Sequence, residues 1–234
     1  MKTATTIGDY VAGTNAALAI SAALAEEPRR GRRIDVSLRD GLMAVQSGWN
    51  ALAFAAGADP ERVGTASPYV APSQVFQAED REFTLAIVSD RHFAALAEAL
   101  ESPDLVASYP TNEARMANRE TLNRKLERLF ETETADHWVD RLGNAGLPVG
   151  HVLTLTEALG DPQARHNQMV VEYEHPKVGT VRTTGSPIRI DHAPSLAPSM
   201  PATLGQHTRS LLHELGVDPG TIEKMIDSGT AVVA

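Results

Sequence analysis

The sequence predicts an α/β protein with two lobes, and three observations support this class. Residues 14–25 are rich in strong helix formers and contain no proline, which predicts a helix. Residues 73–77 and 82–88 are short segments with β-branched and aromatic residues, which predict a pair of strands. Residues 62–72 are rich in glycine, proline and serine, which is typical of a crossing between lobes.

The composition limits the classes of function. The chain has 234 residues, a formal net charge of −9 and 42% hydrophobic residues. The negative charge argues against nucleic acid as the main partner, and no apolar run is long enough to cross a membrane. The absence of cysteine excludes disulfides and a cysteine nucleophile. Residues 1–6 lack the pattern of a signal peptide, so we expect a cytoplasmic protein.

Asp9 is the first candidate for a functional residue. It precedes the helix predicted over 14–25, and an aspartate before a helix is commonly an N-cap whose oxygens accept backbone N–H groups. The positive end of a helix also stabilises an ionised carboxylate, which can then act as a nucleophile. Its position alone leaves both interpretations open.

A cluster of basic residues follows this helix, and most such clusters are solvated turns. A second interpretation is contact with an anionic group, for which the guanidinium group is well suited. Beyond the cluster, Ile34 to Leu38 alternates as a strand does, and Leu42 to Ala56 predicts a helix. The basic residues are Arg29, Arg30, Arg32 and Arg33.

The rest of the chain predicts a second lobe and a return to the first. Leu122, Leu126, Leu129 and Phe130 have the spacing of one buried helix face. Further predicted elements are a helix that begins after Thr134 and stops at Gly146, strands over 169–173, 179–183 and 187–190, and helices over 209–215 and 221–227. The predicted boundaries are 1–60 for part of a large domain, 61–190 for a small α+β domain and 191–234 for the C-terminal return.

Several motifs occur in a familiar order along the chain. They are Gly8-Asp9 before a helix of small residues, a basic glycine-containing turn before Ile34-Asp35-Val36-Ser37-Leu38, a Thr134-to-Gly146 helix that exits through Pro148, and residues 155–165. With these motifs the chain resembles the family III CoA-transferases, which include formyl-CoA transferase and carnitine CoA-transferase. The resemblance runs from Asp9 to the C-terminus. Arg81 departs from it, because family members usually have Asp-Gly at that turn.

The resemblance implies that Asp9 is the catalytic aspartate of an acyl-CoA:carboxylate CoA-transferase, which works through an aspartyl-CoA thioester. It makes the four arginines of the basic cluster candidates for contacts with the phosphates of coenzyme A. It also implies a large domain of nucleotide-fold type, which begins upstream of the aspartate, and interlocked dimers. We therefore expect this chain to be the second part of such an enzyme, in a homo- or hetero-oligomer. No metal and no tightly bound cofactor are expected.

Two other functions stay open. An α-methylacyl-CoA racemase would keep the aspartate and pair it with a glutamate near position 77, where this chain has Gln77, an amide that cannot serve as a base. Glu79 is the nearest carboxylate, and Glu79 with Asp80 is interpreted as a solvated turn. The second alternative is a non-catalytic half that needs a partner chain in order to fold.

Overall fold

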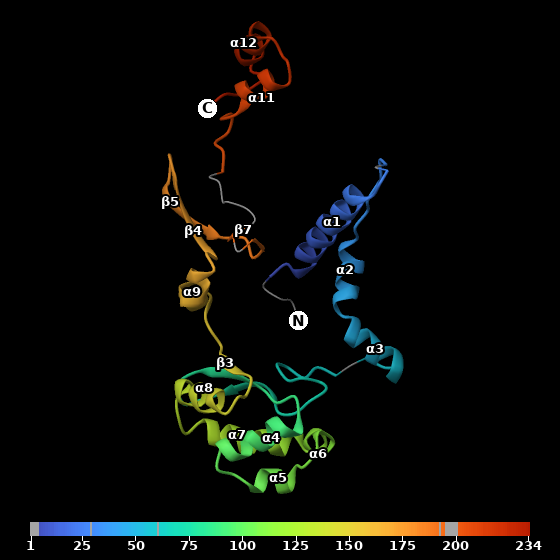
Figure 1. Cartoon of the computed structure of the whole chain (residues 1–234), viewed down its shortest axis with the longest axis vertical. Coiled ribbons are helices and arrows are strands. Elements are labelled where there is room, and N and C mark those ends of the chain that lie inside the picture. The colour runs from blue at the N-terminus through green and yellow to red at the C-terminus, as the bar shows by residue number, and fades with distance from the viewer. Residues whose placement is uncertain (1–4, 29, 60, 192, 195–200) are drawn as a thin grey trace. The chain divides into compact units, whose positions relative to one another are not determined.

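The computed structural model describes residues 5–28, 30–59, 61–191, 193–194 and 201–234 (Figure 1). Helices and strands are both present, so the mixed α/β class is confirmed. By their internal contacts the residues form two compact units, Met1–Gln74 with Ala86–Asn123, and Val75–Leu85 with Arg124–Ala234. The two-lobe arrangement and the boundaries at 60 and 190 stay predictions.

The N-terminal segment forms a group of helices that includes α1 (Ile7–Ala25), α2 (Leu38–Val45) and α3 (Ser47–Ala56). Helix α1 therefore begins seven residues earlier than 14, the predicted start. Its contact with α2 depends on glycine: a Cβ atom at Gly41 would lie 3.2 Å from Cγ1 of Val11, and one at Gly8 would lie 3.3 Å from Cδ1 of Leu42. The two helices approach closely because these positions lack side chains.

The strand predicted over Ile34 to Leu38 is wrong. Residues 34–37 are in neither helix nor strand, and Leu38 already belongs to α2. A strand is stabilised by the ladder to its neighbour, and within the described ranges no strand pairs with this segment. Ser37 instead caps α2, because its hydroxyl accepts the N–H of Asp40 at 3.2 Å.

The predicted strand pair is confirmed and gains a third member. Strands β1 (Ser73–Gln77), β2 (Glu82–Ala86) and β3 (Val149–His151) form one sheet in the order β1-β2-β3. Strand β3 runs antiparallel to β2, with Phe83 opposite His151 and Leu85 opposite Val149. Phe83 and Leu85 are fully buried on one face of the sheet, as the alternation of a half-buried strand requires.

Aromatic rings fill the core beside this sheet. The ring of Phe130, at the end of α7 (Arg119–Phe130), lies 5.1 Å from that of Phe76 and 5.0 Å from that of Phe83. Trp138 of α8 (Ala135–Asn144) lies 5.3 Å from Phe130, and its indole N–H donates to the Phe130 carbonyl at 2.8 Å. The indole N–H of Trp138, the polar group of this cluster, is thus satisfied although its ring is buried. The predicted core positions Leu122, Leu126 and Phe130 are confirmed, whereas Leu129 is only partly buried.

A buried arginine stabilises the compact unit that contains Ala86–Asn123. Arg115 of α6 (Asn112–Ala117) is 1% exposed and donates to the carbonyls of Ala71 at 2.8 Å and Tyr109 at 3.3 Å. It also donates to Oδ1 of Asp90 at 2.6 Å, at the start of α4 (Asp90–Ala99), and its guanidinium lies over the ring of Phe93. Helix α5 (Asp104–Ser108) ends at Tyr109. One side chain therefore joins three separate segments.

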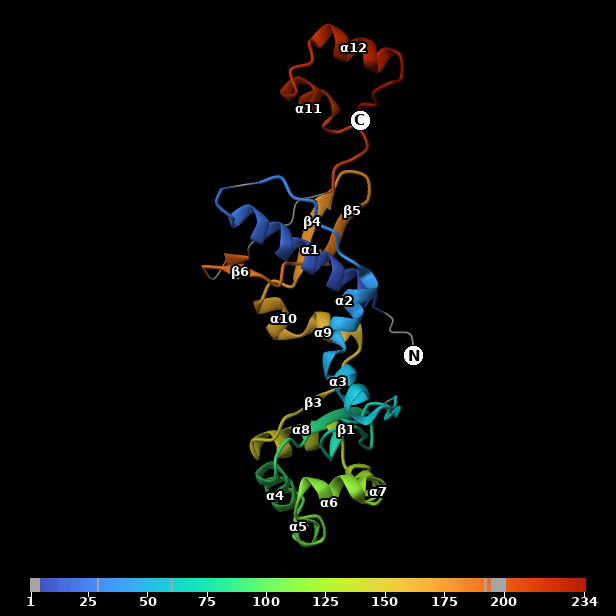
Figure 2. The ribbon, with the colours of Figure 1, turned by 90° about the vertical axis from the view of Figure 1, so that its right-hand side faces the viewer.

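The C-terminal part contains short helices and hairpins. Strands β4 (Val170–His175) and β5 (Gly179–Thr184) lie side by side as an antiparallel pair (Figure 2). The predicted strands near 170 and 180 and the two last helices are confirmed in place. The remaining elements are α9 (Leu155–Gly160), α10 (Pro162–His166), β6 (Arg189–Ile190), β7 (Ala193–Pro194), α11 (Thr208–Glu214) and α12 (Pro219–Asp227).

Gly185→Ala is expected to destabilise the β4–β5 hairpin. A Cβ atom at Gly185 would lie 2.2 Å from the carbonyl oxygen of Gln168, so the backbone has to move, at a cost of about 1–3 kcal/mol. The measurement is thermal unfolding together with amide exchange over β4 and β5. Gly160→Ala is the matched control, because nothing lies within 4 Å of a Cβ atom there. Equal stability of the two variants would contradict the expectation.

Candidate functional site

Asp9 lies in the first turn of α1 and is not its N-cap. The N-cap is Thr6, whose side chain makes no capping hydrogen bond, and Asp9 is the third residue of the helix. The Asp9 side chain is exposed and makes no hydrogen bond or ion pair with another residue of the described part of the chain. An exposed carboxylate without a partner among the described residues is available to a substrate.

A polar groove lies farther along α1, between this helix and residues 35–44. Its volume is about 680 Å³, and Asp9 is not one of its lining residues. The lining residues are Asn15, Asp35, Val36, Ser37, Asp40, Gly41 and Ala44. Large apolar side chains are also exposed on these helices, among them Leu18 at 69% and Phe54 at 86%. These helices therefore carry exposed apolar surface.

The basic cluster follows the other end of α1. Arg29 lies outside the described residues. Arg32 pairs with Glu26, and Nε of Arg33 lies 3.0 Å from Oδ2 of Asp35. Arg30 has no acidic partner among the residues that the structure describes. It lines a groove of about 250 Å³ together with Ile20, Ala23, Leu24, Arg32 and Ile34.

The structure does not bring Asp9 and this basic groove together. Leu24 lies fifteen residues after Asp9 on one straight helix, and at 1.5 Å per residue the separation along the axis is about 22 Å. A contact between the arginines and coenzyme A phosphates stays a prediction. It would require a ligand that extends along most of α1.

A second polar cluster surrounds the turn between β1 and β2. Glu79 and Asp80 are both exposed there, as expected for a solvated turn, and Oδ1 of Asp80 also accepts the N–H of Ala135 at 2.8 Å at the start of α8. This hydrogen bond is the main cause of the lowered pKa of Asp80. The N–H of Glu79 donates to the carbonyl of Glu133 at 2.9 Å. The turn therefore supports the beginning of α8.

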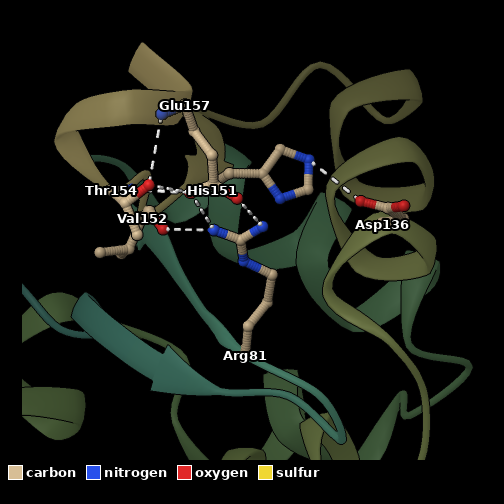
Figure 3. Close-up of polar contacts among 6 residues, drawn as sticks. All are labelled: Arg81, Asp136, His151, Val152, Thr154 and Glu157. Carbon is tan, nitrogen blue, oxygen red and sulfur yellow. Dashed lines mark hydrogen bonds and ion pairs between the residues drawn. The ribbon is translucent and has the colours of Figure 1, made fainter. Parts of the chain in front are cut away.

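Arg81 in the same turn forms a bidentate ion pair (Figure 3). Its two terminal nitrogens donate to the carboxylate of Glu157 at 3.0 and 2.9 Å, and one of them also donates to the carbonyl of Val152 at 3.0 Å. Glu157 in turn accepts the N–H and hydroxyl of Thr154. The hydrogen bond from Arg81, followed by those from Thr154, lowers the pKa of Glu157 to about 2.

The lowered pKa of Glu157 predicts how the stability of the fold depends on pH. Because the pKa falls from its usual 4.5 to about 2 on folding, the ionised carboxylate stabilises the fold above pH 4.5 and this contribution is lost as the pH falls through 2. The measurement is an NMR titration of the Glu157 carboxylate. Arg81→Gln should move its midpoint upward, toward 4.5. A midpoint near 4.5 in the parent protein would contradict the bidentate contact.

His151 lies beside this ion pair, at the end of β3 (Figure 3). Its Nε2 lies 3.5 Å from Oδ1 of Asp136, while its Nδ1 is buried without a hydrogen-bond partner in the described structure.

Among the described residues no group of three histidine or acidic side chains is arranged to hold a metal ion. Of the helices that the structure describes, none combines the length and the apolar character needed to cross a membrane.

Comparison with known proteins decides the family. The model of CoA-transferase family III matches residues 1–208. The acetyl-CoA:oxalate CoA-transferase of Acetobacter aceti is 34% identical over 190 residues, which cover 80% of this chain and 48% of that protein. The succinyl-CoA:glutarate CoA-transferase of Mus musculus is 31% identical over 226 residues, covering 94% and 52%. This chain belongs to CoA-transferase family III.

The solved structures agree with the family assignment. A CaiB/BaiF family protein from Brucella suis superposes with a TM-score of 0.77 at 28% identity, over 92% of this chain and 57% of that one. The resemblance inferred from the Gly8-Asp9 and later motifs is therefore confirmed at the level of the family. This family III chain spans about half the length of the curated relatives it matches.

Proposed function

We propose that this chain is the aspartate-bearing part of an acyl-CoA:carboxylate CoA-transferase and that Asp9 is its covalent nucleophile. The observation that carries the proposal is the state of Asp9: it is exposed, lies in the first turn of α1 and has no partner among the described side chains. The Asp9 carboxylate is therefore accessible to a substrate carbonyl, whereas Asp80 accepts a hydrogen bond from the N–H of Ala135. Asp9 also occupies the position of the catalytic aspartate in the motif that the family resemblance rests on.

The proposed reaction needs no cofactor. The Asp9 carboxylate attacks the thioester carbonyl of an acyl-CoA and expels the CoA thiolate, which leaves a mixed anhydride between Asp9 and the acyl group. The thiolate then attacks the aspartyl carbonyl and releases the donor carboxylate, which gives an aspartyl-CoA thioester. An acceptor carboxylate repeats the two steps in reverse order, so that the new acyl-CoA leaves and the Asp9 carboxylate is restored. Each addition passes through an oxyanion that requires N–H donors.

The relatives support a proposal for the substrate class. The two curated relatives described above transfer coenzyme A from acetyl-CoA to oxalate or from succinyl-CoA to glutarate. We assign to this chain CoA thioesters and carboxylate acceptors of the same kind, namely short mono- and dicarboxylic acids. Arg30 and its neighbours are candidate contacts for CoA phosphates. A cytoplasmic location belongs to the same proposal.

The active form is proposed to be an oligomer. The exposed apolar side chains on α1 and α3, such as Leu18 and Phe54, support this, because apolar surface of this extent is usually covered by other protein. The other half of the family fold can come from the same polypeptide or from a partner chain. The racemase alternative has no support from position 77, because the amide of Gln77 donates to the neighbouring carbonyl of Ala78 at 2.7 Å.

The test is detection of the covalent intermediate. The complete enzyme, with the other half of the fold in the same chain or added as a partner, is incubated with acetyl-CoA or succinyl-CoA and then quenched with hydroxylamine. Hydroxylamine converts an aspartyl thioester or anhydride into a hydroxamate, which peptide mass spectrometry can locate. The expected result is a hydroxamate on the peptide that contains Asp9, dependent on acyl-CoA. A hydroxamate at another carboxylate, or turnover without any modification, would contradict the proposal.

A further inference from the structure

Helix α9 is held to the sheet mainly by polar contacts. It has six residues, none of which is buried, and its first residue, Leu155, is 77% exposed. A helix this short is marginal by itself, and apolar burial does not stabilise this one. It begins shortly after the last backbone contact of the sheet, in which Val152 donates to the carbonyl of Glu82 at 3.3 Å. The chain then changes direction at Pro162, where α10 starts.

Arg81 supplies the contact that joins α9 to the sheet. Its guanidinium binds the Glu157 carboxylate in the first turn of α9 and the Val152 carbonyl in the connection that leads there. Bidentate arginine–carboxylate contacts are directional as well as strong, so the pair defines an orientation and not only a proximity. Glu157 is positioned for this contact by the capping box with Thr154.

The chain has Arg81 at the turn between β1 and β2. The resemblance described above implies Asp-Gly at this turn, and glycine is required there only where φ is positive. The non-glycine residues with positive φ in the described chain are Glu101, Gln168 and Asp191, so Arg81 has an ordinary backbone conformation. A long side chain is therefore accommodated without strain in this turn.

We propose that the ion pair of Arg81 with Glu157, called the latch below, holds the first turn of α9 against the β1–β2 turn. Ionic strength, rather than pH, controls the strength of this ion pair. The two partners are partly exposed, at 34% and 42%, so mobile ions screen their attraction. The ionisable groups around Arg81 are Glu157, Asp80, Asp136 and His151. Glu157 and Asp80 both have lowered pKa values, so the acidic side of the latch stays ionised at neutral and mildly acidic pH.

Amide hydrogen exchange on the full chain tests the latch. The reporter is the N–H of Ala158, which donates to the Thr154 carbonyl within the first turn of α9, and the reference is the N–H of Trp138 in α8. Arg81→Gln and Glu157→Gln each remove the ion pair, while glutamine at 157 keeps an acceptor for the capping box. Arg182→Gln is the control, because it removes an ion pair with Glu172 elsewhere in the same unit.

The latch predicts a specific pattern of exchange rates. Each latch variant should accelerate exchange at Ala158 by roughly threefold to tenfold, and the double variant by no more than either single one. Raising the salt concentration from about 20 mM to about 500 mM should accelerate amide exchange at Ala158 in the parent protein but not in the double variant. Arg182→Gln should leave the exchange rate at Ala158 unchanged. Unchanged exchange at Ala158 in both latch variants, or equal acceleration at Trp138, would overturn the latch.

Discussion

Asp9→Asn is expected to abolish CoA transfer and leave the fold intact. An amide cannot attack a thioester and then release the acyl group, so turnover by the complete enzyme should fall by at least about a thousandfold. The fold should lose less than about 1 kcal/mol, because Asp9 is exposed and contributes only its interaction with the positive end of α1. The measurements are transferase activity with acetyl-CoA or succinyl-CoA and thermal unfolding of both proteins.

Asp40→Asn is the matched control for this substitution. Asp40 is also exposed and also lies in the first turn of a helix, α2, so the same charge is removed in a similar environment. The transferase activity of Asp40→Asn should stay within a few-fold of that of the parent protein. Full activity of Asp9→Asn would exclude the nucleophile. Unfolding of Asp9→Asn, together with no covalent adduct on the parent, would instead assign Asp9 a structural role.

Arg115→Met is expected to cause a large loss of stability. Methionine fills much of the same volume, but the carbonyls of Ala71 and Tyr109 lose their donor while they stay buried. Unsatisfied buried acceptors cost about 1–3 kcal/mol each, so we expect a loss of about 3 kcal/mol or more. Asp90 contributes less to this loss, because its side chain is 63% exposed and can bind water. Chemical denaturation of the two proteins measures the difference.

Arg128→Met provides the comparison for Arg115. Arg128 is an exposed arginine in the last turn of α7, so the same substitution should change stability by less than about 0.5 kcal/mol. A similarly small effect at Arg115 would show that its three hydrogen bonds are replaced by water or by other donors. Arg115→Lys should also be strongly destabilising, because one ammonium group cannot replace the guanidinium fork at three separate acceptors.

Local patterns in the sequence predicted the features that depend on neighbouring residues. The spacing of Leu126 and Phe130 identified the buried face of α7, and Thr134 with Gly146 located the limits of α8. The Gly8-Asp9 motif led to the family and to the candidate nucleophile. These predictions held because a helix face and a helix cap are determined within a few residues.

The features that sequence reasoning missed depend on distant residues. Arg115 is buried because acceptors at Ala71, Asp90 and Tyr109 converge on it, and nothing in its own segment distinguishes it from a surface arginine. The contact between Arg81 and Glu157 joins positions 76 residues apart. The strand predicted over 34–38 failed for the same reason, since a strand pattern specifies a face but not the neighbour that completes the ladder.

Gly41 determines how closely α2 can approach the part of α1 that carries Asp9. Even one methyl group there would come within 3.2 Å of Val11, which is tighter than ordinary contact, so α1 or α2 would have to yield by a few tenths of an ångström. Val11 is two residues from Asp9 on the same rigid helix. One added carbon atom at Gly41 would therefore change the distance between α1 and α2, and with it the position of Asp9, the proposed nucleophile.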